Sequence, residues 1–146
     1  MNNVYLDVCC YNRPFDDQTD SKIRLESDAV LSIISLCENN MITIYGSDVI
    51  DYEICNCANM EKRNKVLILS SICLYKIKLN ISIINRAAFL EKNGIDSIDA
   101  LHLAAAESKC GILFTTDFNF IKKANTIENL NIRVLNPAYW VISGGK

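Results

Sequence analysis

The chain has 146 residues, half of them hydrophobic and 22% charged, with a formal net charge of −2 at pH 7. This length suits one domain with a real core and is too short for two. The composition excludes a disordered chain, and the net charge excludes a general attraction to nucleic acid, so such a partner needs a local basic patch or a bound cation. We expect one globular domain over residues 1–146.

Targeting features and metal-binding cysteine patterns are also missing. No apolar run approaches the ~20 residues that a membrane helix needs, and the first ten residues lack the basic region and cleavage site of a signal peptide. We therefore expect a cytoplasmic protein without a membrane partner. The seven cysteines form no CxxC pair and have one histidine to help them, which favours reduced core thiols over a zinc site.

Segments of strand length alternate with segments of helical periodicity along the chain. In chain order the pattern predicts a strand over 3–8, an Arg/Pro/Asp loop, a helix over 27–39, a strand over 41–45, a helix from Ser47, a helix over 61–74, an ambiguous segment over 77–81, a helix over 83–92, a helix within 96–110, a strand over 112–116, a helix over 118–124 and a strand over 132–135. Asn136-Pro137 is expected to stop the last strand. This alternation predicts an α/β fold in which helices cover both faces of a parallel sheet.

The stretch from Gly94 to Phe120 combines a buried helix with a buried strand. Its helix is rich in small apolar residues on nearly every side, with Asp96 or Ser97 as the N-cap. The strand that follows ends at Asp117, and ligands of open α/β sheets bind just outside the carboxyl ends of the strands. An acid at that end is placed for chemistry more than for stability.

Four acidic residues are expected to meet at this edge of the sheet. Asp7 lies near the end of the first strand, Asp117 ends its own strand, Glu53 lies one to two turns into the helix after the second strand, and Asp99 lies in the first turn of the central helix. Carboxylates packed together repel one another unless a cation lies among them, and Mg²⁺ and Mn²⁺ prefer carboxylate oxygens. The pattern predicts Asp7, Glu53, Asp99 and Asp117 as metal ligands and catalytic residues.

Each acid also has a purely structural interpretation. Asp96 and Asp99 have the spacing of residues that cap a helix and favour its dipole, Glu53 alone is typical of a solvated helix residue, and Asp117 suits a turn or an N-cap. Asp7 is harder to explain in this way, because an unpaired acid that ends an apolar strand is costly to bury. The agreement of all four positions favours the functional interpretation of each.

Four motifs in register carry a family resemblance. They are Leu6-Asp7, the helix over 47–54 with Glu53, the segment Asp99-Ala100-Leu101-His102-Leu103-Ala104, and Thr115-Thr116-Asp117. In this order they resemble the PIN-domain family of metal-dependent nucleases, which includes ribonuclease toxins of VapC type. The resemblance spans nearly the whole chain, including the closing segment over 133–137. It implies a three-layer α/β/α fold with a central parallel sheet of about four to five strands.

The same resemblance implies a function and partners. It implies an endoribonuclease that uses Mg²⁺ or Mn²⁺ to hydrolyse single-stranded RNA, and the toxin of a type II toxin–antitoxin pair, with an antitoxin as partner and a homodimeric assembly. The chain departs from the family pattern at Val8, where many members have Ser or Thr, and at Asn119, where many have a further acid. Both departures concern a second metal position.

Residues that could contact the substrate are polar or basic and lie near the acidic motifs. They are Arg13, Thr116, Asn119, Lys62, Arg63 and Lys65. Alternatives remain open for most of them: Arg13 could pair with Asp16 or Asp17, Thr116 could be an ordinary strand residue, and the basic run over 62–65 could be a solvated helix face. With Lys122 and Lys123, that run could instead line a groove for the nucleic-acid backbone.

His102, the only histidine, lies one helical turn from Asp99. We interpret it as a packed, hydrogen-bonded residue rather than a general base, because a metal can activate water without it. An alternative function is a catalytically silent PIN-like module that binds RNA or protein, with its acids serving as caps and surface charge. A phosphatase or phosphotransfer receiver fits less well, because the chain lacks an Asp-x-Asp after the first strand and paired acids at its start.

Overall fold

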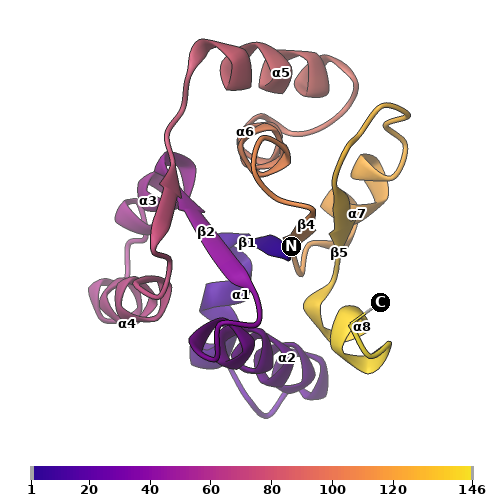
Figure 1. Cartoon of the computed structure of the whole chain (residues 1–146). Coiled ribbons are helices and arrows are strands. Elements are labelled where there is room, and N and C mark those ends of the chain that lie inside the picture. Colours follow the sequence, from indigo (N-terminus) through magenta and orange to yellow (C-terminus); the bar gives the residue numbers. More distant parts are fainter. Residues whose placement is uncertain (1, 146) are drawn as a thin grey trace.

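The structure, a computed structural model, describes residues 2–145. Its centre is a five-stranded parallel sheet in the order β3-β2-β1-β4-β5 (Figure 1). The strands are β1 (Asn3–Leu6), β2 (Thr43–Ser47), β3 (Tyr75–Ile77), β4 (Ile112–Phe114) and β5 (Arg133–Leu135). The predicted α/β fold with a parallel sheet is confirmed.

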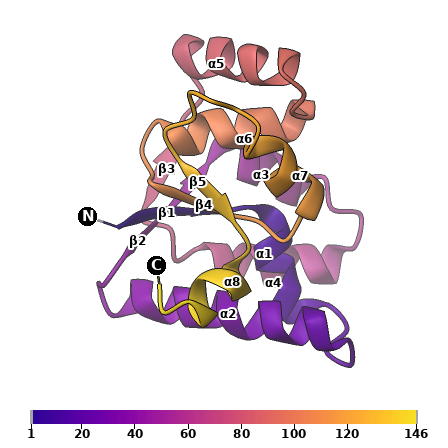
Figure 2. The same cartoon turned by 90° about the vertical axis from the view of Figure 1, so that its right-hand side faces the viewer.

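Helices cover both faces of the sheet, as Figures 1 and 2 show. They are α1 (Val8–Asn12), the 3₁₀ helix η1 (Arg13–Phe15), α2 (Ser21–Glu38), α3 (Asp48–Cys55), α4 (Met60–Ser70), α5 (Ile81–Lys92), α6 (Ser97–Glu107), α7 (Phe118–Ala124) and α8 (Pro137–Ile142). Helix α6 packs on β2 and β4 with α5 against its outer side, while α2 and α8 pack together on the opposite face.

Strand β1 lies at the centre of the sheet, between β2 and β4. Its residues Val4, Tyr5 and Leu6 are fully buried, which explains the apolar run at the start of the chain. Leu6 pairs with Phe114, and the next N–H, that of Asp7, donates to the Phe114 carbonyl at 2.9 Å. The strands that end before Asp7 and before Asp117 are therefore neighbours, so both acids lie at one edge of the sheet.

The buried character of α6 is also confirmed. Five of its residues, Ala100 and the four from Leu103 to Ala106, are apolar and at most 2% exposed, because the sheet lies on one side and α5 on the other. Small side chains let these layers approach closely. This packing fixes the start of α6, and with it Asp99, near the carboxyl edge of the sheet.

Two predictions about loops are wrong, and both errors involve capping. The segment after Asp7 forms α1 and η1 rather than a loop, because the Asp7 side chain caps α1 by accepting the Val8 N–H. Asn136-Pro137 starts α8 rather than only ending a strand, because Asn136 caps that helix and proline suits its first position. Helix α2 also begins six residues earlier than expected, at a cap formed by Asp20.

Three further expectations concern the segment over 77–81, membrane helices and the cysteines. Of the ambiguous segment over 77–81, only Ile77 belongs to a strand, the last residue of β3 at the sheet edge; residues 78–80 are irregular and Ile81 begins α5. Within residues 2–145, no helix combines the length and apolar character needed to cross a membrane. The seven cysteines are free thiols, yet only Cys10 and Cys110 are buried, so the expectation of core thiols holds for these two.

Candidate metal centre

Asp7 is held rigidly at the junction of β1 and α1. Its Oδ1 accepts the Val8 N–H at 2.8 Å, its Oδ2 accepts the Thr115 hydroxyl at 2.8 Å, and the Cys9 thiol lies 3.4 Å from Oδ2. The side chain is almost fully buried. Within residues 2–145, no Lys or Arg lies within ion-pair distance of this carboxylate, so its donors orient it without neutralising its charge.

Glu53 on α3 and His102 on α6 complete a compact cluster with Asp7. The Nε2 atom of His102 makes a direct hydrogen bond to Oε1 of Glu53 and lies 3.7 Å from Oδ1 of Asp7. One possible ligand atom from each of the three residues falls within 4.8 Å of the others. The sheet and two helices thus bring together groups from three distant parts of the sequence.

A buried hydrogen-bond chain extends from His102 away from the acids. His102 Nδ1 lies 2.6 Å from the Tyr5 hydroxyl, which lies 2.6 Å from the Ser47 hydroxyl, and Ser47 accepts the Ile50 N–H at 3.1 Å. Every atom is satisfied when Ser47 donates to Tyr5, Tyr5 donates to Nδ1, and Nε2–H donates to Glu53. Burial also raises the pKa of Tyr5 well above its usual range, which keeps this hydroxyl protonated.

The negative charge of the cluster changes the pKa of His102. Burial alone would lower the pKa of His102, but the hydrogen bond to Glu53 and the negative charges of Asp7, Glu53 and Asp99 outweigh burial and raise it. The interpretation of this histidine as a packed, hydrogen-bonded residue agrees with these contacts. The sequence did not reveal that its partner is Glu53, because no sequence pattern gives the distance between α3 and α6.

Asp99 lies in the first turn of α6 and is half-buried. Burial, followed by the charges of Asp7 and Asp117, raises the pKa of Asp99 to about 7, and His102 partly opposes this. Asp99 therefore belongs electrostatically to the acidic cluster, although its oxygens lie outside the compact group formed by Asp7, Glu53 and His102.

Asp117 combines a structural role with its place at the site. It is exposed and caps α7, because its Oδ1 accepts the Phe120 N–H at 3.1 Å. Thr115 links it to Asp7, since the Thr115 hydroxyl accepts the Asp117 N–H at 3.1 Å and donates to Asp7. Sequence reasoning missed Thr115 in favour of Thr116. Only the register of β1 and β4, extended by one residue, reveals that Thr115 lies opposite Asp7.

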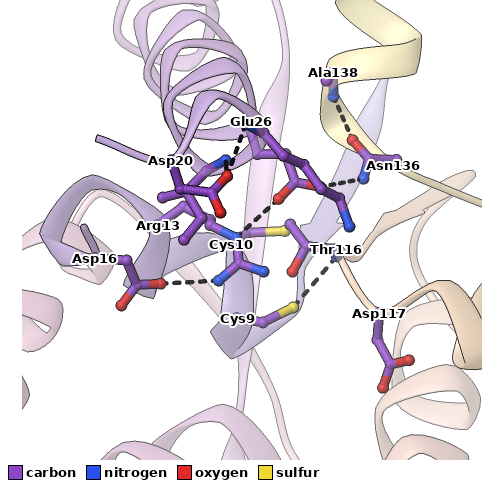
Figure 3. A network of polar contacts seen from close by, with 12 residues as sticks. Cys9, Cys10, Arg13, Asp16, Asp20, Glu26, Thr116, Asp117, Asn136 and Ala138 are labelled. Atoms are coloured by element: carbon purple, nitrogen blue, oxygen red, sulfur yellow. Dashed lines mark hydrogen bonds and ion pairs between the residues drawn. The ribbon is translucent and has the colours of Figure 1, made fainter. Parts of the chain in front are cut away.

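The predicted substrate-contact residues differ in their surroundings. Arg13 bonds Glu26 at 2.9 Å and Asp16 at 2.8 Å, as Figure 3 shows, and Lys62 reaches the same Asp16 at 2.7 Å. Lys65 pairs with Glu61 at 3.3 Å. The alternative in which Arg13 pairs with Asp16 is therefore realised, and three of the basic candidates have acidic partners within the chain.

The remaining candidates are Thr116, Asn119 and Arg63. Thr116 is buried, and its backbone N–H points to the Cys9 sulfur at 3.4 Å (Figure 3). Asn119 is exposed on α7. Arg63 on α4 lines a small pocket together with Glu53, so it is the basic candidate that lies directly beside the acidic cluster.

The donor set of the cluster fits a hard divalent cation. It consists of the carboxylate oxygens of Asp7 and Glu53, which Mg²⁺ and Mn²⁺ prefer, and of Nε2 of His102, and among residues 2–145 no Lys or Arg forms an ion pair with either carboxylate. Burial, and after it the negative charges of Asp7 and Asp117, raise the pKa of Asp99 to about 7, and His102 offsets these charges only in part. Asp7 and Glu53, with Asp99 and Asp117 beside them, are the residues that such a cation would meet.

Comparisons with known proteins give the fold. No protein-family model and no curated protein sequence match the chain. One chain of the crystal structure of VapBC2 from Rickettsia felis, bound to a DNA fragment from their promoter, is similar with a TM-score of 0.61 and 17% identity, over 92% of this chain and 98% of that one. A chain of FitAcB from Neisseria gonorrhoeae has a TM-score of 0.57 and 15% identity, over 92% and 97%. The fold is PIN-like, as the sequence motifs predict.

Proposed function

We propose that this protein is a divalent-cation-dependent endoribonuclease that hydrolyses phosphodiester bonds in single-stranded RNA. The observation that carries the proposal is the convergence of Asp7 and Glu53 on His102, beside an Asp99 whose pKa is about 7, at the carboxyl edge of a parallel sheet. Uncompensated acids at this edge are typical of a catalytic site rather than of a structural ion pair.

The residues of the chain have distinct roles in this proposal. Asp7, Glu53, Asp99 and Asp117 hold Mg²⁺ or Mn²⁺, while Thr115 and the Val8 N–H orient Asp7, and His102 orients Glu53. A bound divalent cation supplies activation of a water molecule and stabilisation of the charge that builds on the leaving oxygen. No residue of the cluster needs to form a covalent bond to the substrate.

The structural neighbours support a more specific role. The likeness to VapBC2 and FitAcB, together with the VapC-like motifs, supports the proposal that the chain is the toxin of a toxin–antitoxin pair. An antitoxin protein would then be its partner, and a homodimer in the cytoplasm its expected form. These partners are part of the proposal and depend on the same family resemblance.

A second candidate is a catalytically silent PIN-like module that binds RNA or protein. The ion pairs of Arg13, Lys62 and Lys65 and the capping bonds of Asp7 and Asp117 favour it, because they give these residues structural roles. The silent module does not explain why Asp99 lies half-buried among like charges. For that reason we prefer the nuclease.

The test compares the parent protein, Asp99→Asn and Asp96→Asn on a pool of cellular RNAs, with EDTA or with Mn²⁺. Asp96 is a matched control, because it lies at the start of the same helix but pairs with Lys123 at 3.2 Å. We expect the parent and Asp96→Asn to cut RNA only with Mn²⁺, and Asp99→Asn to remain folded but inactive. Equal cutting by the parent and Asp99→Asn would reveal a contaminant, and binding without cutting by the parent would favour the silent module.

A further inference from the structure

A small pocket lies next to the acidic cluster, where α1, α3 and α4 pack against one another. Its volume is about 130 Å³, roughly the space of four water molecules, which suits one ring system rather than a whole nucleotide. The lining residues that matter here are Val8, Ile54, Val66, Asn12, Arg63 and Glu53. Glu53 is shared with the acidic cluster, so the pocket and the candidate metal centre adjoin.

The apolar and polar groups of the pocket are arranged separately. Val8, Ile54 and Val66 are at most 8% exposed, so they close the pocket with an apolar floor and present little surface to a ligand. Asn12 precedes η1 without capping it, and within residues 2–145 its amide makes no hydrogen bond to another side chain or to the backbone. The amide is therefore available to a ligand as both donor and acceptor.

Arg63 differs from its basic neighbours. Arg13, Lys62 and Lys65 each have a carboxylate within 3.3 Å, whereas Arg63, half-buried at the same pocket, has no ion pair in the described part of the chain. A guanidinium offers several donors in a fixed plane, which suits a phosphate group. The pocket thus combines an apolar floor, one amide without a hydrogen-bond partner and one cation without an ion pair among the described residues.

We propose that this pocket receives one base of the single-stranded RNA substrate, next to the phosphodiester that is cut. The base enters edge first above the floor formed by Val8, Ile54 and Val66, Asn12 hydrogen-bonds that edge, and Arg63 contacts a neighbouring phosphate. Unpaired bases of single-stranded RNA are commonly recognised by hydrogen bonds to their edges. This inference rests on the proposed nuclease function and names the element of that site that selects the sequence.

The charges around the pocket favour RNA over a peptide as occupant. A basic peptide side chain in the pocket would meet Arg63, and an acidic one would meet Glu53 and the nearby Asp7. A neutral peptide side chain avoids both conflicts but brings no anion to Arg63, whereas an RNA chain offers a neutral base to the pocket and a phosphate to Arg63. The volume also limits the occupant to one base at a time.

The binding experiment uses Asp99→Asn, so that RNA is not cut, and measures fluorescence anisotropy with octamers of adenylate, uridylate and cytidylate. Asn12→Ala, with Asn12→Asp as a second variant, should remove the preference among the octamers and weaken binding of the preferred octamer about tenfold, the loss expected for one or two hydrogen bonds. Arg63→Gln should weaken all three about equally, because phosphate contacts carry no base information. Asn64→Ala on α4, an exposed neighbour of Arg63 that does not line the pocket, should leave the preference unchanged.

A cleavage arm separates this inference from the proposed function. The same Asn12 and Arg63 variants with Asp99 intact are incubated with a random-sequence RNA pool and Mn²⁺, and the cut sites are sequenced. If the parent cuts and Asn12→Ala keeps the parent's base profile, the pocket inference is wrong and the nuclease stands. If RNA binds with a base preference that Asn12→Ala removes but nothing is cut, the pocket stands and the nuclease fails. Absence of any base preference, or of RNA binding, overturns the pocket assignment.

Discussion

Asp99 is the acid whose titration the fold alters most clearly. Its pKa is about 7 in the folded protein because of burial and the charges of Asp7 and Asp117, against an ordinary value of 3.8. Between pH 3.8 and about pH 7, Asp99 is therefore mostly protonated in the folded protein and mostly ionised in the unfolded chain. This group's contribution to stability is therefore full below pH 4 and is lost as the pH rises to about 7.

We expect Asp99→Asn, which stays neutral, to avoid this loss in metal-free protein. Because the side chain is only half-buried, solvent screening reduces the effect to about 1 kcal/mol, or roughly 2–4 °C in Tm. The measurement is thermal unfolding of both proteins in EDTA between pH 5 and pH 8. The Tm of Asp99→Asn should rise relative to that of the parent as the pH increases. If the two proteins show the same change of Tm with pH, Asp99 is not coupled to the other acids.

The hydrogen-bond chain behind His102 supports a second expectation at the scale of the residue. Tyr5→Phe keeps the buried ring but removes the hydroxyl that joins His102 to Ser47, so the orientation of His102 toward Glu53 is weakened. Loss of a direct partner of a metal ligand typically costs about 10-fold to 100-fold in metal affinity, and because Tyr5 acts through His102 we expect a loss at the lower end, about 10-fold. Calorimetric titration with Mn²⁺ should show this loss.

Tyr11→Phe is the matched control for that change. Tyr11 is equally buried, but its hydroxyl contacts Cys73 at 3.2 Å and makes no contact with the acidic cluster. Both variants lose a buried hydroxyl, so both should lose some stability. Equal Mn²⁺ affinity in the two proteins would mean that the hydrogen-bond chain has a structural role only.

The sequence could predict the acids of the site better than their supports. Asp7 and Glu53 follow strands of a parallel sheet, and parallel strands end at one edge, so their proximity follows from local pattern. Thr115 and the Tyr5 hydroxyl become visible only when the register of β1 and β4 and the distance between β1 and α6 are known. These are tertiary quantities, and periodicity along one segment does not contain them.

At the scale of the element, the helices that the sequence pattern did not predict, α1 and α8, begin at side-chain caps. Arg13, Pro14 and the acids after them resemble a loop in composition, yet Asp7 caps α1 and Arg13 is fixed by Glu26, which is 1% exposed. Asn136 then joins α8 to the same Glu26 at 2.6 Å. A buried acid that ties η1, α2 and α8 together is invisible without the fold.

Helix α6 is the element on which the site depends most, because it carries both Asp99 and His102. Ala105 is fully buried between the sheet and α5, so Ala105→Asp places an unpaired charge in the core. We expect a loss of several kcal/mol out of a stability of about 5–15 kcal/mol, which is enough to unfold the domain. Circular dichroism during thermal unfolding checks this.

Ser108→Asp is the control for that variant, since Ser108 is exposed at the end of the same helix. The Tm of Ser108→Asp should lie close to that of the parent. If Ala105→Asp also melts like the parent, then α6 has a solvated face, and the position assigned to Asp99 beside the acidic cluster is wrong. Activity would not be needed to reach that conclusion.

At the scale of the molecule, the four acids come from residues 7 to 117 and so span most of the chain. They lie after β1, within α3, in the first turn of α6 and after β4. Elements that meet only in the folded state thus supply the proposed binding site. A cation held there would stabilise the folded state and not the unfolded chain, so its binding and the folding of the whole domain would be linked.

We therefore expect Mn²⁺ to raise Tm in proportion to the logarithm of its concentration once it exceeds Kd. At 100 times Kd the gain is about 2.7 kcal/mol, which corresponds to roughly 5–10 °C for a domain of this size. Asp7→Asn should lose most of this gain, since asparagine still caps α1 but lacks the charge. Asp28→Asn, which removes an exposed acid on α2, should keep it. Because both variants change net charge equally, equal shifts in the two proteins would mean that Mn²⁺ acts on the overall charge of the molecule and not at the acidic cluster.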